Sequence, residues 1–194
     1  GRILFDVDDQ EIPQSLFEEE IRPLVEWEKV PDRIKMKWGA ATKATSVRAL
    51  PSDVKMLEEL CDFEFDQLQF TLIKLWTPVG IFHSSKDGRW LYIQAPYVRG
   101  WVKAKDIAVF PDRDSLKKFV KSENFLAVTG ESIPLFRDPG LRKLLQRPSM
   151  GTILPLVVSP SPQPSPQRGE GEILKSPSPP FPPKDGSAFF VAER

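Results

Sequence analysis

Residues 80–94 read GIFHSSKDGRWLYIQ. Apolar and polar residues alternate on both sides of the Asp87-Gly88 pair, a pattern typical of two antiparallel strands joined by a tight turn. A second strand pattern, YVRGWVKAKDI, follows at residues 97–107. Short strands at such close spacing predict a small β-barrel over residues 38–110.

The overall composition narrows the class of protein. A chain of 194 residues has room for two small domains, and its 27 basic residues are balanced by 27 acidic ones. Without a basic stripe we expect no nucleic-acid partner, and no apolar run reaches the roughly 20 residues of a membrane span. The single cysteine excludes an internal disulfide and a multi-cysteine metal site. We therefore expect no metal, no cofactor and no membrane span.

The segment before the barrel, residues 1–37, is predicted to be a partly helical N-terminal arm. Ser15 is a plausible helix N-cap, and apolar residues recur at near-helical spacing between Leu16 and Val25. Two aromatic residues, Trp27 and Trp38, are the expected anchors of this arm on the barrel.

The segment after the barrel has two parts. Residues 111–124 predict a helical linker that is capped at Asp114. Residues 125–194 return to strand patterns, interrupted at 159–183 by a stretch rich in Pro, Ser, Gln and Gly. This stretch cannot bury enough apolar surface to offset its ordering entropy, so it is expected to be disordered or locally polyproline II. Residues 189–191 are predicted to be a strand that pairs back across this insertion. The second barrel is expected to be incomplete, with an open edge.

Several segments in the same order resemble the first bacterial SH3 domain of NlpC-type cell-wall hydrolases. These are WGAATKATSVRALPSD at 38–53, DFEFDQLQ at 62–69, TPV at 77–79 and YVRGWV at 97–102. Residues 125–194 are similar to the second SH3 domain of those proteins, through 129–136 and 150–155. The run at 161–172, by contrast, resembles translated interspersed repeats of bacterial reading frames.

The resemblance implies an all-β protein of two tandem SH3-like barrels, the second incomplete. In this family a cysteine peptidase domain follows the SH3 domains and cleaves γ-D-glutamyl-diamino-acid bonds in peptidoglycan. The resemblance therefore implies a non-catalytic module that recognises peptidoglycan stem peptide, or shapes the cleft of a C-terminal peptidase domain, in the cell envelope or periplasm. A docking scaffold and an incomplete fragment of such a hydrolase remain the alternatives.

Catalysis by the chain itself would need Cys61 and His83, the single thiol and the single imidazole. The acidic residues around Cys61 disfavour a thiolate, and no second histidine is present to orient His83. We therefore predict no catalytic residue. On this prediction Cys61 is a loop thiol and His83 a surface or strand histidine, without a joint role.

Binding residues are expected among the aromatic side chains of the predicted strands. Trp90, Tyr92 and Tyr97 offer apolar area with a polar tip, which suits a short peptide or sugar-peptide. Arg48 and Asp53 bracket the start of the long loop and are candidates for holding a peptide carboxylate or amine, although Arg48 is equally suited to pair with an acid of that loop. Binding of the chain's own PxxP spacings at 177–183 by the barrel is a further alternative.

Overall fold

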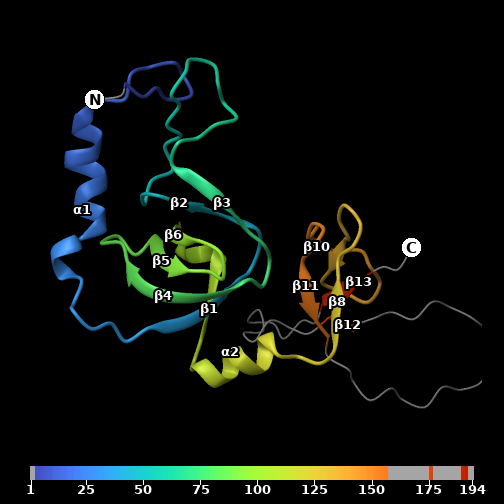
Figure 1. The fold of residues 1–194 in the computed structure, drawn as a ribbon. Helices are drawn as coiled ribbons and strands as arrows, with labels where there is room; N and C mark the ends of the chain where they lie inside the picture. The colour runs from blue at the N-terminus through green and yellow to red at the C-terminus, as the bar shows by residue number, and fades with distance from the viewer. Residues whose placement is uncertain (1–2, 157–174, 177–188, 192–194) are drawn as a thin grey trace, which may run out of the picture.

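The computed structural model describes residues 3–156, 175–176 and 189–191. Its main element is a seven-stranded antiparallel sheet with the strand order β3-β2-β6-β5-β4-β1-β7 (Figure 1). The strands are β1 (Lys37–Ala41), β2 (Thr45–Arg48), β3 (Gln69–Ile73), β4 (Pro78–Ser84), β5 (Trp90–Gln94), β6 (Arg99–Lys103) and β7 (Ile107–Phe110). A short 3-10 turn, η3 (Ala104–Asp106), connects β6 to β7.

The sheet curls around one apolar core. Each of its seven strands contributes at least one buried side chain to a single cluster, and even the two edge strands, β3 and β7, meet there through Ile73 and Ile107. Burial of this apolar area is the main driving force for closing the sheet. The other strand residues of the cluster are Ala41, Val47, Val79, Ile81, Ile93 and Val102.

The β4–β5 hairpin turns at Asp87 and Gly88, as the sequence predicts. Gly88 has a φ of +69°, a conformation that glycine adopts without steric cost. The Asp87 carboxylate accepts hydrogen bonds from the Ser85 hydroxyl at 2.5 Å and from the Arg89 amide at 3.0 Å. These contacts, led by the Ser85 hydroxyl, lower the pKa of Asp87.

The N-terminal arm forms a longer helical segment than predicted. It comprises a π-helical stretch, η1 (Leu16–Ile21), the α-helical turn α1 (Arg22–Val25) and the 3-10 turn η2 (Trp27–Lys29). The prediction that Ser15 caps the helix is wrong, because its backbone is itself helical and its side chain makes no cap bond. The prediction that Trp27 anchors the arm is also wrong, since 76% of its surface is exposed.

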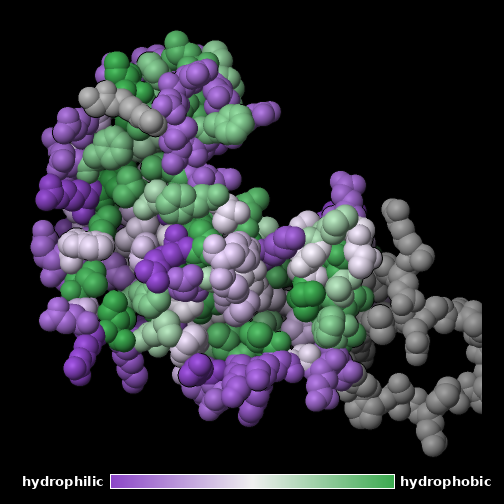
Figure 2. All heavy atoms as spheres, in the orientation of Figure 1, coloured by the Kyte–Doolittle hydropathy of each residue, from purple (hydrophilic) through white to green (hydrophobic). Residues whose placement is uncertain are grey.

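The arm packs on the long loop that joins β2 to β3. Ile12 and Ile21 are buried against Met56 and Leu68 of the loop. The backbones of Phe5 and Leu57 also exchange two hydrogen bonds, of 2.9 and 2.8 Å. The loop carries exposed apolar residues as well: Leu60, Phe63 and Phe65. Figure 2 shows apolar side chains among polar ones in the upper part of the molecule, where the arm and this loop lie.

A helix, α2 (Arg113–Val120), follows the main sheet. Its N-cap is Asp112 and not the predicted Asp114, because the Asp112 carboxylate accepts a 2.7 Å hydrogen bond from the Ser115 amide. Leu116 is buried against Ala40 of β1 and Phe110 of β7. This contact fixes the helix to one edge of the main sheet.

The C-terminal part forms two small sheets, with the strand orders β10-β9-β13-β12 and β11-β8. Strand β13 pairs with both β9 and β12, as predicted for residues 189–191. The expected disorder over 159–183 is wrong at residues 175–176, which form β12, and the rest of that stretch lies outside the described residues. Assignment of this part to a second SH3-like barrel stays a prediction. Its strands are β8 (Phe125–Ala127), β9 (Leu135–Phe136), β10 (Leu144–Gln146), β11 (Ile153–Pro155), β12 (Lys175–Ser176) and β13 (Phe189–Val191).

The core of the C-terminal part includes residues from the main sheet. Leu75 and Trp76, in the turn between β3 and β4, are buried against Val128, Leu135 and Leu154. Trp76 has a φ of +63°, which is unusual for a large side chain, and its ring meets Phe119 of α2 edge-on with centroids 5.8 Å apart. The two parts of the molecule therefore share one set of buried contacts.

We predict that Trp76→Ala destabilises the C-terminal part selectively. Loss of a buried tryptophan costs about 3–5 kcal/mol, and here the cavity opens among Val128, Leu135 and Leu154. Hydrogen exchange should accelerate in residues 125–156 and stay slow in β4–β6. The exposed Trp27→Ala is the matched control, and equal protection of the C-terminal amides in both variants would contradict the shared core.

Candidate functional site

A cavity of about 450 Å³ lies between the N-terminal arm and the outer face of the main sheet, and we call it the arm pocket. One wall comes from the arm: Val25, Trp27, Val30 and Ile34. The opposite wall comes from β4, β5 and β6: Phe82, His83, Tyr92, Arg99 and Trp101. Ala49 and Leu50, at the start of the β2–β3 loop, close one side.

Strand alternation and one β-bulge build the sheet wall. Ile93 and Val102 point into the core, so their neighbours Tyr92 and Trp101 point outward. In β4 the register shifts between Ile81 and His83, which leaves Phe82 and His83 both against the arm pocket. With strict alternation His83 would point into the core. The bulge therefore places the His83 imidazole on the outer face of the sheet.

The aromatic side chains of this wall contact one another. The Trp101 ring lies 5.3 Å from the Tyr92 ring and 5.9 Å from the His83 ring, between centroids. Only 4% of Trp101 is exposed, whereas Tyr92 is half-buried. The result is a firm aromatic surface with one accessible phenol ring.

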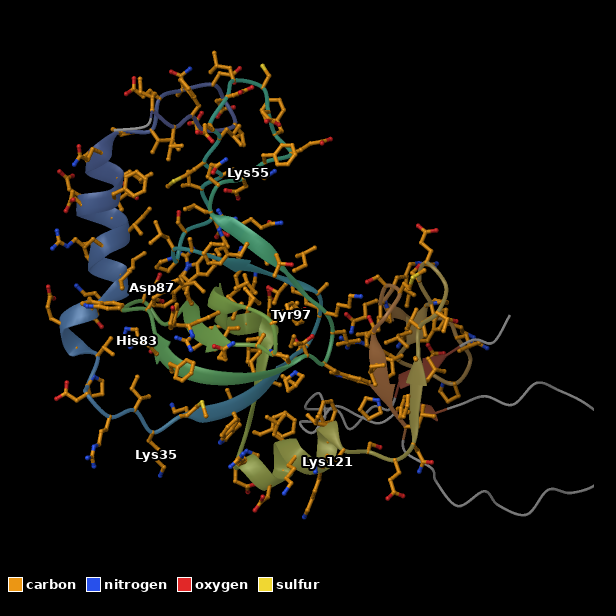
Figure 3. All side chains as sticks on the ribbon, in the orientation of Figure 1. Lys35, Lys55, His83, Asp87, Tyr97 and Lys121 are labelled. Carbon is orange, nitrogen blue, oxygen red and sulfur yellow. The ribbon has the colours of Figure 1, made fainter. Side chains whose placement is uncertain are left out.

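Two hydrogen bonds attach the arm to the β4–β5 hairpin. Nε2 of His83 donates to the Val25 carbonyl at 2.8 Å, and the Lys86 amide donates to the Leu24 carbonyl at 2.9 Å. Carbonyls at a helix C-terminus lack partners within the helix, so the hairpin satisfies groups that would otherwise need water. Figure 3 shows His83 and Asp87 on the side of the sheet that faces the N-terminal helix.

A buried ion pair organises the loop behind the pocket. The Arg48 guanidinium donates to the Asp66 carboxylate at 2.7 Å and to the Val54 carbonyl at 2.7 Å. The other carboxylate oxygen of Asp66 accepts from the amides of Met56 and Leu68. Both charged side chains are more than nine-tenths buried, so Arg48 holds the loop together from within.

The five predicted binding residues lie in different places. Tyr92 lines the arm pocket, and Arg48 pairs with a loop acid. Trp90 is 2% exposed and lies beside Asp53, whose carboxylate pairs with Lys103 at 2.6 Å. Tyr97 is 60% exposed and lines a separate hollow toward the C-terminal part (Figure 3), where its hydroxyl donates to the Leu72 carbonyl at 3.2 Å.

The remaining pocket residues were not predicted from the sequence. Residues of the arm enter the site only through its packing on the loop, which no local pattern reveals. Phe82 enters through the bulge in β4. Arg99 and Trp101 lie two residues apart in β6 and therefore share one face of the sheet. This spacing is the one signal in the sequence for the outward direction of Arg99.

Cys61 and His83 have separate partners. The Cys61 thiol contacts the Asp9 carboxylate at 3.5 Å, and this hydrogen bond, aided by the negative charge of Asp9, raises the pKa of Cys61. His83 is bonded to the Val25 carbonyl. Within the described residues, no group of three or more His, Cys, Asp and Glu side chains is placed to hold a metal ion, and no helix has the length and apolar character to cross a bilayer.

Part of the sequence matches the model of a known protein family. Residues 57–103 match the model of the SH3 domain of the SH3b1 type. The matched residues run from the β2–β3 loop to the end of β6, so this part of the molecule is an SH3 domain of this type. A comparison with curated proteins found no match.

Among solved structures, the chain is similar to a novel NlpC/P60 endopeptidase from Photobacterium damselae subsp. piscicida. The TM-score is 0.67 and the sequence identity 18%, so the likeness concerns the fold. The match covers 99% of this chain and 39% of the endopeptidase, which means that the chain spans well under half the length of that protein. Over 99% of its length the chain thus shares its fold with part of an NlpC/P60 endopeptidase.

We predict that Arg48→Ala strongly destabilises the SH3 domain. The substitution leaves the buried Asp66 carboxylate without its cation, which typically costs about 3–5 kcal/mol. Urea unfolding measures the change. Arg89→Ala is the control, because its pairs with Asp53 and Asp87 are exposed and such pairs contribute less than about 1 kcal/mol. Equal unfolding midpoints for the two variants would show that Arg48 does not hold the loop.

We predict that His83→Ala loosens the arm without unfolding the sheet. Loss of the hydrogen bond to the Val25 carbonyl lowers the free energy that holds the arm on the sheet by about 1 kcal/mol. The Lys86 amide donates to the Leu24 carbonyl of the arm, so its hydrogen exchange reports when the arm detaches. Hydrogen exchange at Lys86 should become several-fold faster, while Ser84→Ala, on the same strand, should leave it unchanged. Unaltered exchange at Lys86 in His83→Ala would mean that the imidazole does not fasten the arm.

Proposed function

We propose that this chain is a non-catalytic module that recognises peptidoglycan stem peptide in the arm pocket. The observation that carries the proposal is the pocket itself, which is lined by aromatic and aliphatic side chains and by one accessible cation, Arg99. Such a lining suits a short peptide that has both apolar and charged groups. The likeness in fold to an NlpC/P60 endopeptidase supports the choice of ligand class and a place in the cell envelope or periplasm.

In a longer protein the module would act beside a peptidase domain. Its contribution would be to hold the peptide or to form one wall of the substrate cleft. The proposal assigns no catalytic residue to this chain, because the Cys61 thiol is held by Asp9 and the His83 imidazole by the arm. A stem peptide incubated with the purified chain should therefore be bound and recovered intact.

A docking scaffold is the second candidate, and one observation favours it. Exposed apolar side chains follow the β2–β3 loop into the edge strand β3, with Phe65, Phe70 and Leu72 each more than half exposed. Surface of this kind is common where a neighbouring domain packs. In this case the barrel would position that domain and leave the arm pocket without a ligand.

Titration with a muropeptide separates the two candidates. Trp27 and Trp101 line the arm pocket, so binding should produce a saturable change in tryptophan fluorescence. Tyr92→Ala removes the accessible ring of the aromatic wall and should weaken binding by about 1–2 kcal/mol, because tyrosines are among the few contact residues whose truncation costs more than about 1 kcal/mol.

Tyr97→Ala is the matched control, because Tyr97 lies in a different hollow and should not affect the affinity. Circular dichroism establishes that both variants are folded. No fluorescence change at millimolar ligand, or equal weakening by both substitutions, would contradict recognition in the arm pocket.

A further inference from the structure

The Arg99 guanidinium at the arm pocket is held in a fixed orientation. Its Nε donates to the Oε1 of Gln94 at 2.9 Å, and Gln94 is the residue opposite Arg99 in the β5–β6 ladder. The amide nitrogen of Gln94 donates in turn to the carbonyls of Ala95 and Val98, which fixes which end of the amide faces Arg99. The Cζ atom of Arg99 also lies over the Phe82 ring, 5.6 Å from its centroid.

The Arg99 side chain has no carboxylate partner in the part of the chain that the structure describes. Arg22, Arg48 and Arg89 pair with an acid, whereas several other arginines of the described residues do not, so Arg99 is distinguished by its fixed orientation at the pocket. No Asp or Glu lines the arm pocket either. Because Nε is already used by Gln94, the two terminal nitrogens of Arg99 are the groups left to meet a ligand.

We propose that the arm pocket binds a carboxylate of its ligand through the terminal nitrogens of Arg99, while the aromatic wall takes the adjoining apolar part. The inference rests on the proposed function and specifies which end of the peptide enters. An oriented guanidinium next to aromatic rings matches the planar, two-oxygen geometry of a carboxylate. A cationic group in the same place would meet the charge of Arg99 with no carboxylate among the lining side chains to offset it. An amide would offer Arg99 one neutral oxygen in place of two charged ones, which makes a weaker hydrogen-bonded pair.

Stem peptides carry the required group. A γ-D-glutamyl-diamino-acid dipeptide has free carboxylates next to short aliphatic segments, and its fully amidated form has the same size without negative charge. The pair is therefore a direct probe of carboxylate recognition. Gln94 acts as a positioning residue, since it orients Arg99 without being required to touch the ligand.

The test compares the affinities of the acid and the amide for the full chain and for three variants. The chain should bind the acid about tenfold or more tightly than the amide, as expected for hydrogen bonds to a charged group. Arg99→Gln should abolish this preference, and Arg99→Lys should keep only part of it, because lysine retains the charge and loses the planar fork. Arg89→Gln removes the same charge away from the pocket and should keep the full preference.

The outcomes distinguish the two levels of the proposal. Saturable binding of both ligands with equal affinity, or a preference that survives in Arg99→Gln, would overturn carboxylate recognition and leave peptide recognition intact. Failure of the chain to bind either ligand would overturn both. A preference lost equally in Arg89→Gln would show that net charge, and not the oriented Arg99, selects the ligand.

Discussion

The buried ion pair of Arg48 and Asp66 is the contact on which the site depends. It fixes the β2–β3 loop from inside, through hydrogen bonds that also involve the backbone at Val54, Met56 and Leu68. A buried pair of this kind contributes little net stability against an apolar alternative but makes any other loop conformation costly. The arm packs on this fixed loop. The arm pocket between the arm and the sheet therefore depends on the conformation of the loop.

The sheet and its turn follow from local sequence, whereas the pocket does not. Alternation around Asp87-Gly88 predicts the β4–β5 hairpin because side-chain direction in a strand has a period of two. The exposure of Trp27 and the entry of Phe82 into the pocket depend on long-range packing and on a bulge, neither of which leaves a periodic signal. Alternation puts Tyr92 and Trp90 on one face of the predicted strand, and both are binding candidates for their apolar area and polar tip. Alternation does not separate them, although Tyr92 lines the arm pocket and Trp90 is buried beside Asp53.

The two parts of the molecule are coupled by buried contacts as well as by chain connection. Leu75 and Trp76 leave the main sheet to complete the core of the C-terminal part, and Lys74 donates to the Met150 carbonyl nearby. The sequence pattern places the end of the first barrel at residue 110 and gives no sign of these contacts. The reason is that the turn between β3 and β4 joins two strands of the main sheet and also contributes side chains to the core of the C-terminal part. The same turn borders the hollow that holds Tyr97, away from the arm pocket.

Chemical-shift mapping with a γ-D-glutamyl-diamino-acid dipeptide tests the central claim most directly. The account predicts that shifts concentrate at Val25, Trp27, Tyr92 and the Arg99 side chain, which come from the arm and from two neighbouring strands and meet only at the arm pocket. Shifts confined to Tyr97 and its surroundings, or to the charged surface at Asp53, would place recognition elsewhere and contradict the account.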